Sequence, residues 1–302
     1  KELPIHMLTG TPLTNRPRDL FPLLQLANHS LGRSFVSFAK RYCEGVRTEY
    51  GWQAMGASNI EELTVQLHGI MLRRTKNKVL DLPPKIRSWI DVEVKSNVAK
   101  RMSEAVMEAL NARRGEDEDR EGAPTIVRRS RQGRILGRLS SARRRLATSK
   151  VRSTIPFIED IVEQGEKVLV FSCFVQPIEI IQKKFGDLAV SISGSTPTGK
   201  RQGIADRFQD DDNVRILAAN IVAGGIGLNL TAARQVVFND LDWQPSNHWQ
   251  AEDRAYRIGQ TQSVNVTYMV GTGTVEEFVR TVLEAKSDII DQLVEGRSLP
   301  ED

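Results

Sequence analysis

The sequence contains little cysteine and little histidine. Its 302 residues include two cysteines, Cys43 and Cys173, and four histidines, and no Cys-X-X-Cys pair occurs. Two cysteines cannot form a disulfide framework, which indicates a reducing compartment: the cytoplasm in a bacterium or archaeon, the nucleus in a eukaryote. Because the histidines and cysteines show no metal-ligand spacing, the sequence predicts no metal site in this chain.

Long apolar runs are also missing. No run approaches the roughly 18 apolar residues that cross a membrane, so no membrane partner is expected. The opening, KELPIHMLTG, starts with Lys1 and has no signal-peptide stretch, so we expect a fragment of a longer polypeptide. Apolar residues make up 40% and charged residues 26%, which is typical of globular domains with a packed core.

Acidic residues are absent from one long basic stretch. The formal net charge is only +4, but residues 128–152 contain ten Arg or Lys and no Asp or Glu. The acidic run EDEDRE, at 116–121, lies just before this stretch. Such asymmetry indicates a polyanionic partner, with nucleic acid the first candidate, and the alternative is a solvated helix face.

The pattern of apolar residues changes near residue 150. Before it, the segments 17–40, 60–80 and 97–113 have helical periodicity, 86–94 alternates like a strand, and 114–124 has the composition of a flexible charged linker. After it, short apolar strands alternate with helices. The expected strands are 167–174, 188–193, 214–220, 235–240 and 264–270, and the expected helices are 153–164, 176–185, 200–209, 246–258 and one that begins at Thr274. This alternation predicts an α/β fold with a parallel sheet covered by helices on both faces.

Residues 194–201, GSTPTGKR, have the glycine and lysine spacing of a P-loop. A P-loop also needs Ser or Thr after the lysine to hold Mg²⁺, and an acid at the end of a neighbouring strand. Asp240 could supply the acid, but Arg201 occupies the hydroxyl position and Pro197 removes a backbone N–H. The sequence therefore favours a surface turn, or a loop that binds a phosphate of a nucleic-acid backbone.

Residues 240–260, DLDWQPSNHWQAEDRAYRIGQ, resemble motif VI and the segment before it in the Swi/Snf-type branch of superfamily 2 helicase-like ATPases. Five other segments resemble parts of the same branch, in the same order. They are LTGTPLTN (8–15, motif III), MLRRTKNKVLDLPPK (71–85, between the lobes), VLVFSCF (168–174, motif IV), ISGSTPTGKRQGIADRF (192–208, after motif IV) and AANIVAGGIGLNL (218–230, motif V). Within this branch, the segment QAEDRAYRIGQ is similar to the corresponding segment of the HARP-like annealing-helicase subgroup and its bacterial relatives.

The resemblance implies two RecA-like lobes with ATP in the cleft between them. Residues 1–16 would be the tail of lobe 1, 17–149 a mostly helical protrusion and linker, and 150–302 the RecA-like lobe 2. Lobe 1 of the same polypeptide is expected upstream, with the phosphate-binding loop and the Mg²⁺ ligands. This fragment alone is therefore expected to be inactive.

The resemblance also implies that Arg254 and Arg257 reach the γ-phosphate of ATP, with Arg257 as the arginine finger. The two arginines are three residues apart, so on a helix they would share a face. Glu252 and Asp253 are expected to orient them. The full set of expected ATP-binding residues is Gly225, Gly227, Gln250, Asp253, Arg254 and Arg257.

Contacts with the DNA backbone are implied as well. The residues expected to make them are Thr11, Arg73, Arg74, Ser172, Gly194, Ser195, Lys200, Arg201, Asn220 and Trp243. A core tryptophan is the alternative at Trp243, and Arg73 and Arg74 could instead brace the lobes. Asn220 and Ile221 stand where many relatives have Ser-Thr, and Ile221 cannot hydrogen-bond a phosphate.

The function implied by the resemblance is the C-terminal half of an ATP-dependent double-stranded DNA translocase of the remodelling, repair or defence type. ATP and Mg²⁺ would be its cofactors, and duplex DNA and lobe 1 its partners. Two alternatives stay open. One is a non-catalytic nucleic-acid-binding module, and the other is an RNA-polymerase-associated or RNA-directed superfamily 2 ATPase.

Overall fold

The computed structural model describes residues 5–9, 12–13, 15–48, 51–72, 74, 76–118, 125–224 and 227–295. The chain divides into two units. The first comprises Lys1–Asp81, Trp243–His248 and Thr281–Asp302, and the second comprises Leu82–Asp242 and Trp249–Arg280. None of the described helices is long and apolar enough to cross a membrane.

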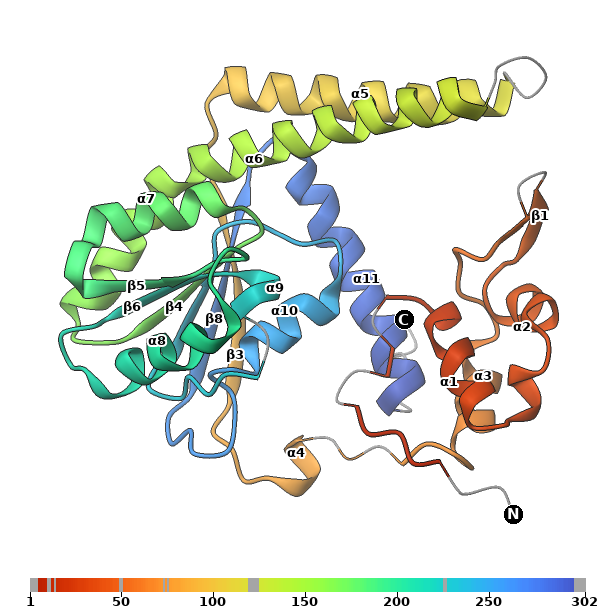
Figure 1. Cartoon of the computed structure of the whole chain (residues 1–302), viewed down its shortest axis with the longest axis horizontal. Helices are drawn as coiled ribbons and strands as arrows, with labels where there is room; N and C mark the ends of the chain where they lie inside the picture. The colour runs from red at the N-terminus through yellow and green to blue at the C-terminus, as the bar shows by residue number, and fades with distance from the viewer. Residues whose placement is uncertain are drawn as a thin grey trace. The chain divides into compact units, whose positions relative to one another are not determined.

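The second unit is built on a six-stranded parallel sheet (Figure 1) with the order β3-β8-β7-β4-β6-β5. The strands are β3 (Lys85–Val92), β4 (Val168–Ser172), β5 (Ala189–Ile192), β6 (Ile216–Asn220), β7 (Gln235–Phe238) and β8 (Val264–Gly271). In the register of the central strands, Val168 of β4 lies opposite Ile216 of β6 and Gln235 of β7. The predicted α/β fold with a parallel sheet is confirmed.

The central strands are apolar except at their ends because helices cover the sheet. All five residues of β4 are buried. Val168 and Val170 of this strand pack in one core with Ile158, Ile178 and residues of other strands. The helices of this unit are α5 (Ser96–Glu118), α6 (Thr125–Glu163), α7 (Val175–Phe185), α8 (Thr198–Asp210), α9 (Ile221–Gly224), α10 (Pro245–Glu252, shared with the first unit) and the start of α11 (Val275–Glu295), with a 3-10 turn at Gly186–Leu188.

Helices α5 and α6 run side by side as a long hairpin (Figure 1). The sequence predicted a helix at 153–164, but α6 begins at Thr125, so the basic stretch 128–152 lies within one continuous helix. The linker predicted over 114–124 is wrong at its start, because residues 114–118 belong to helix α5, and residues 119–124 lie outside the described residues.

The N-terminal part of the first unit, residues 1–81, consists of short elements. They are η1 (Pro17–Leu20), α1 (Phe21–Leu26), η2 (Ser30–Gly32), α2 (Phe35–Tyr42), β1 (Val46–Thr48), β2 (Gly51–Gln53), α3 (Ile60–Leu67) and α4 (Lys76–Val79). The prediction of one helix over 17–40 is wrong, because Asn28 adopts a left-handed conformation, with φ of 51°, that ends α1. The helix predicted over 60–80 is also too long, since α3 ends at Leu67 and a turn containing Gly69 follows it.

The strand predicted at 86–94 is present as β3, and it joins the edge of the sheet beside β8. The sheet therefore includes residues that lie outside the expected range 150–302, while the division of the chain into lobes stays a prediction. The start of the last helix is confirmed: Thr274 precedes α11, and its Oγ1 accepts a hydrogen bond from the N–H of Glu276 at 3.2 Å. Glu277 at N3 accepts from the N–H of Gly273, the residue before Thr274, at 2.9 Å, so both side chains satisfy backbone N–H groups at this helix start without the reciprocal Thr274–Glu277 bonds of a capping box.

Candidate nucleotide and DNA site

Polar side chains gather where three neighbouring strands of the sheet end. Ser172 is the last residue of β4, Asn220 is the last residue of β6, and Asp240 lies two residues beyond the end of β7. Because these strands are parallel, their carboxyl ends meet at one edge of the sheet. This is the edge at which open α/β sheets bind ligands.

The peptide backbone of Cys173 is held from both sides at this edge. Its N–H donates to Asp240 Oδ1 at 2.9 Å, and its carbonyl oxygen accepts from Asn220 Nδ2 at 3.0 Å. Burial, with the negative charges of Asp240 and Asp242, raises the pKa of the Cys173 thiol. The backbone of Cys173 therefore joins the ends of β4, β6 and β7.

The prediction that Ser172 donates to a DNA phosphate needs correction. Ser172 is 1% exposed, and its hydroxyl donates to Asp240 Oδ2 at 2.6 Å while accepting from the N–H of Phe174 at 3.0 Å. The hydroxyl hydrogen is already used inside the protein. We therefore assign Ser172 to the support of the loop after β4 and not to the DNA surface.

Asn220 is the cap of the short helix α9. Its Oδ1 accepts from the N–H groups of Val222 at 3.2 Å and Ala223 at 3.4 Å. Ile221, which cannot bind a phosphate, is 1% exposed and packs in the core. Both ends of the Asn220 amide are thus engaged with the backbone, and its DNA contact stays a prediction.

Arg254 and Arg257 converge on the loop that follows α9. The Nη1 atoms of Arg254 and Arg257 lie 3.4 and 3.5 Å from the carbonyl oxygen of Leu228. Arg254 also donates from Nε to the carbonyl of Gln250 at 3.0 Å, and its own carbonyl accepts from the N–H of Leu230 at 3.0 Å. These contacts bring the motif VI and motif V segments together.

The prediction that the two arginines share a helix face is wrong in its geometry. Helix α10 ends at Glu252, six residues earlier than predicted, and both arginines lie in the turns that follow. The pair converges because these turns fold back on Leu228. Arg254 is half-buried and Arg257 is exposed. Burial, followed by the positive charge of Arg257, lowers the pKa of Arg254.

Glu252 anchors the edge strand β3 instead of orienting the arginines. Its side chain is fully buried, with Lys85 Nζ and Arg87 Nη2 each 2.7 Å from Oε2, and it also accepts from the hydroxyl of Tyr268. Burial alone would raise the pKa of Glu252, but the charges of Lys85 and Arg87 outweigh it and lower this pKa to about 2. Asp253 Oδ1 lies 3.7 Å from Lys85 Nζ.

Sequence reasoning missed Lys85, Arg87 and Tyr268. Lys85 and Arg87 lie 167 and 165 residues before Glu252, and no local pattern marks them as its partners. A basic pair on an edge strand is ordinary surface composition. Only the pairing of β3 with β8 brings these cations to the base of the motif VI turn.

The GSTPTGKR loop is a turn that starts helix α8. The N–H of Ser193 donates to Thr196 Oγ1 at 3.0 Å, and the N–H of Thr196 donates to the carbonyl of Ser193 at 3.1 Å. Arg201 folds back and donates from Nε to the carbonyl of Thr196 at 3.1 Å. Its guanidinium thus lies on the loop where a P-loop would have its Mg²⁺ ligand, which disfavours the P-loop interpretation.

Other predicted residues fall into three groups. Gly194, Ser195 and Lys200 are exposed at the loop before α8, where a phosphate backbone could reach them. Trp243 and Arg74 belong to the first unit, and the carbonyl of Trp243 accepts from Lys286 Nζ at 2.8 Å. The predicted residues outside the described part of the chain are Thr11, Arg73 and Gly225.

Two remaining predictions concern the nucleotide. Gln250 is half-buried in α10, next to the turn that carries the arginines, and Gly227 adopts φ of 69° immediately before Leu228. Within the described ranges, no group of three or more His, Cys, Asp or Glu could hold a metal ion.

Comparison with known families divides the chain in agreement with the motif order. Residues 5–133 match the SNF2-related domain, and residues 150–259 match the helicase conserved C-terminal domain. The first match includes the helical first part and β3, and the second includes β4, β5, β6 and β7, while β8 follows it.

Curated relatives cover nearly the whole chain. The DNA annealing helicase and endonuclease ZRANB3 of Mus musculus is 32% identical over 302 residues, which are 96% of this chain and 27% of that protein. The SWI/SNF-related matrix-associated actin-dependent regulator of chromatin subfamily A-like protein 1 of Xenopus tropicalis is 31% identical over 297 residues, 95% of this chain and 30% of that protein. The chain therefore spans less than a third of the length of these two relatives.

One solved structure agrees with this assignment, and a second supports the fold. The Sulfolobus solfataricus SWI2/SNF2 ATPase core in complex with dsDNA matches with a TM-score of 0.53 and 26% identity, over 92% of this chain and 60% of that chain. The C-terminal part of the Fun30 ATPase domain matches with a TM-score of 0.54 and 20% identity, over 72% of this chain and 100% of that chain, and supports the fold alone. With its ordered motifs, its parallel sheet and these matches, the chain belongs to the SNF2-related, Swi/Snf-type branch of the helicase-like proteins.

Proposed function

We propose that this chain is the arginine-supplying part of an ATP-dependent double-stranded DNA translocase of the remodelling, repair or defence type. The observation that supports the proposal most directly is the convergence of Arg254 and Arg257 on the carbonyl of Leu228. Two guanidinium groups held by one carbonyl form a concentrated positive charge. Such a charge is suited to a triphosphate, whose oxygens accept paired hydrogen bonds from arginine.

In the proposed mechanism, Arg257 is the arginine finger because it is the exposed member of the pair. Arg254 lies behind it, half-buried and tied to Gln250 and Leu228, and fixes the turn that carries Arg257. A finger arginine contributes about 10³–10⁵ in rate, or roughly 4–7 kcal/mol. Gly227 and Gln250 would line the nucleotide on the same side as the two arginines.

The phosphate-binding loop and the Mg²⁺ ligands would come from the RecA-like lobe that precedes these residues in the longer protein. Arg254 and Arg257 support this division of labour, since they place two cations at the turn after α10. When bound there, Mg²⁺ would neutralise the phosphate charge. The chain alone would then bind nucleic acid but hydrolyse ATP very slowly.

Duplex DNA is the proposed track. A structural neighbour with 26% identity was solved in complex with dsDNA, and a curated relative is named as a DNA annealing helicase. The exposed groups of Gly194, Ser195 and Lys200 would contact backbone phosphates. Because phosphate contacts carry no base information, binding would be weakly sequence-dependent and strongly salt-dependent.

The test is the DNA-stimulated ATPase activity of the longer protein that contains these residues. Arg257→Ala is expected to lower turnover by about 10³-fold or more while ATP binding persists. Arg207→Ala removes an exposed arginine of α8 and is the matched control, with turnover expected to stay at the wild-type value. Unchanged turnover in Arg257→Ala would refute the finger assignment. Stimulation by RNA in place of duplex DNA would favour the RNA-directed alternative.

A further inference from the structure

The proposed function leaves the basic stretch of α6 without a role. Three of its ten cations have structural partners. Arg138 pairs with Glu108 at 2.6 Å, Arg143 donates to the carbonyl of Leu241 at 2.7 Å, and Lys150 is buried against Glu276 and the carbonyl of Met269. The side chains of Arg128, Arg129 and Arg131 lie outside the described residues.

The four remaining cations of the stretch are exposed. They are Arg134, Arg144, Arg145 and Arg152. At 3.6 residues per turn, Arg134, Arg145 and Arg152 point within about 20° of one another. We call these three residues the arginine row. Lys150 and Thr154, which are buried, lie on the opposite side of the helix, so the row faces away from the packed core.

The dimensions of the row suit an extended polyanion. A rise of 1.5 Å per residue separates the three arginines by about 16 and about 10 Å along the helix axis, about 27 Å in total. This length corresponds to roughly eight phosphates of one strand of B-DNA, at 3.4 Å each along the duplex axis. A rigid helix keeps the spacing fixed.

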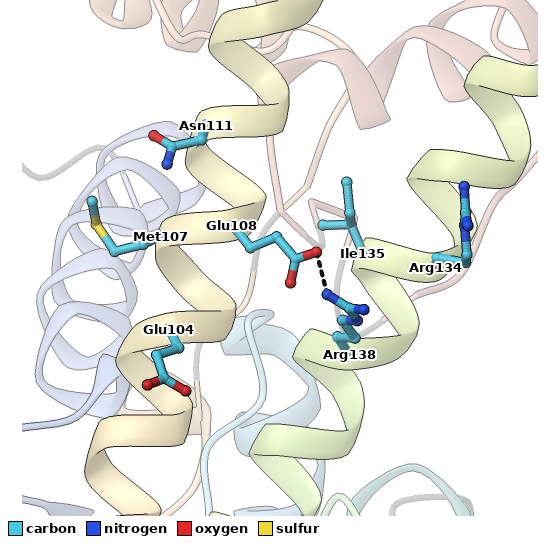
Figure 2. A pocket seen from close by; sticks show the side chains of 7 residues that line it. All are labelled: Glu104, Met107, Glu108, Asn111, Arg134, Ile135 and Arg138. Atoms are coloured by element: carbon cyan, nitrogen blue, oxygen red, sulfur yellow. Dashed lines mark hydrogen bonds and ion pairs between the residues drawn. The ribbon is translucent and has the colours of Figure 1, made fainter.

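A groove between α5 and α6 lies beside Arg134, the first residue of the arginine row. It is lined by Glu104, Met107, Glu108, Asn111, Arg134, Ile135 and Arg138 (Figure 2). In Figure 2, Arg138 reaches across the groove to Glu108, whereas Arg134 extends away from Glu108. Because Arg134 and Arg138 line the groove together with Glu104 and Glu108, the charges of the groove balance, and Arg145 and Arg152 extend the positive charge of the row beyond it.

The chemistry of this face favours nucleic acid over protein. Small polar residues, Ser141 and Thr148, lie between the arginines on the same side of the helix, and no aromatic or large aliphatic residue interrupts the row. Protein interfaces depend on buried aromatic and aliphatic anchors, which this face lacks. Arginine, by contrast, binds phosphate through two parallel hydrogen bonds.

We infer that the arginine row of α6 is a second contact surface for double-stranded DNA, separate from the loop residues at the carboxyl edge of the sheet. The identity of the polyanion as duplex DNA rests on the proposed function. The row would bind the backbone of the duplex without regard to sequence and would raise the affinity of each binding event.

The test compares three variants of the 302-residue chain by fluorescence anisotropy with a labelled DNA duplex over a range of salt concentrations. The first variant replaces the row with glutamine, R134Q/R145Q/R152Q. The second, R134K/R145K/R152K, keeps the charge. The control, K183Q/K184Q/R207Q, removes three exposed cations from α7 and α8.

The glutamine variant of the row is expected to bind duplex DNA about tenfold more weakly at low salt. Each phosphate contact contributes about 0.9 to the slope of log K against log salt, so its slope should fall by about 2 to 3. The lysine variant and the control should keep wild-type slopes. Equal slopes for the glutamine variant and the wild-type chain, or an equal loss in the control, would overturn the inference.

Two further measurements, a competition assay and the ATPase activity of the longer protein, separate this inference from the proposed function. If RNA or polyglutamate displaces the duplex from the wild-type chain more readily than unlabelled duplex does, the assignment of the row to DNA is overturned. If the row variants bind like the wild-type chain while duplex DNA still stimulates the ATPase of the longer protein, the inference fails and the proposed function stands.

Discussion

Arg254 and Arg257 direct their Nη1 atoms to the same carbonyl oxygen, that of Leu228, at 3.4 and 3.5 Å. The position of this carbonyl depends on Gly227, which precedes it and adopts φ of 69°. The left-handed conformation suits glycine and costs other residues roughly 1–2 kcal/mol. The geometry of the arginine pair is thus tied to one backbone conformation in the motif V loop.

Gly227→Ala is expected to lower the proposed DNA-stimulated ATPase activity of the longer protein by about tenfold or more, because a displacement of about 1 Å at a catalytic group can cost two orders of magnitude. The matched control is Gly165→Ala, which imposes a similar strain at φ of 79° in the turn after α6, with open space around the added Cβ. Thermal unfolding should show similar losses of stability in both variants. An equal loss of ATPase activity in both would show that strain alone, and not the position of Leu228, accounts for the effect.

Glu252→Gln is expected to destabilise the second unit by about 3–5 kcal/mol at pH 7, because it leaves Lys85 and Arg87 without their buried counter-charge. The pKa of Glu252 is lowered from 4.5 to about 2 in the folded protein, so the wild-type carboxylate contributes stability that is present above pH 4.5 and lost as the pH falls toward 2. Urea unfolding at several pH values measures this contribution.

The pH dependence distinguishes the charge of Glu252 from its packing. Below pH 4.5, the free energy of unfolding should fall less steeply in Glu252→Gln than in the wild-type chain. Glu179→Gln, at an exposed site on α7, is the control and should retain the wild-type slope. Parallel slopes for all three proteins would contradict the assigned role of Glu252.

Asp240→Asn is expected to destabilise the chain by about 1–3 kcal/mol, the cost of a disrupted buried hydrogen bond. The wild-type Oδ2 accepts from Ser172 and from the side-chain amide of Asn239, at 2.6 and 3.1 Å, while Oδ1 holds the N–H of Cys173. An amide that keeps the bond to Cys173 would turn its NH₂ toward the NH₂ of Asn239. Denaturant unfolding measures the loss.

A double-mutant cycle with Ser172→Ala tests whether Ser172 and Asp240 act as one unit. The loss in the double variant should be smaller than the sum of the two single losses, because both changes remove the same hydrogen bond. Additive losses would indicate that the Ser172 hydroxyl has another partner, and the earlier prediction of a phosphate contact would regain support.

Several parts of the fold could be predicted from local patterns. The continuous apolar run at Val168–Ser172 predicts a buried strand of a parallel sheet, and all its residues are buried in the structure. Thr274 predicts the start of the last helix because capping involves only neighbouring residues. The order of the motifs predicted the family, which the comparisons confirmed.

Local patterns failed where one residue or one distant contact outweighed the periodicity. Asn28 ends α1 by its backbone conformation, although the apolar spacing around it continues as in a helix. The stretch predicted as a helix through 258 ends at Glu252, where the next residues fold back on Leu228. Ser172 was assigned to DNA because its burial and its bond to Asp240, 68 residues away, are not visible in the sequence.

The sequence by itself determined the parallel sheet, the buried strands and the presence of an arginine pair in motif VI, because apolar periodicity and ordered motifs depend on residues close in the chain. Only the tertiary structure decided where the charges point. Glu252 meets Lys85 and Arg87, and the two arginines meet Leu228, because strand pairing and turn geometry bring distant segments together. A buried polar side chain forms its hydrogen bonds with the groups that lie beside it in the folded protein. Those groups come from distant parts of the chain, so the local sequence does not identify them.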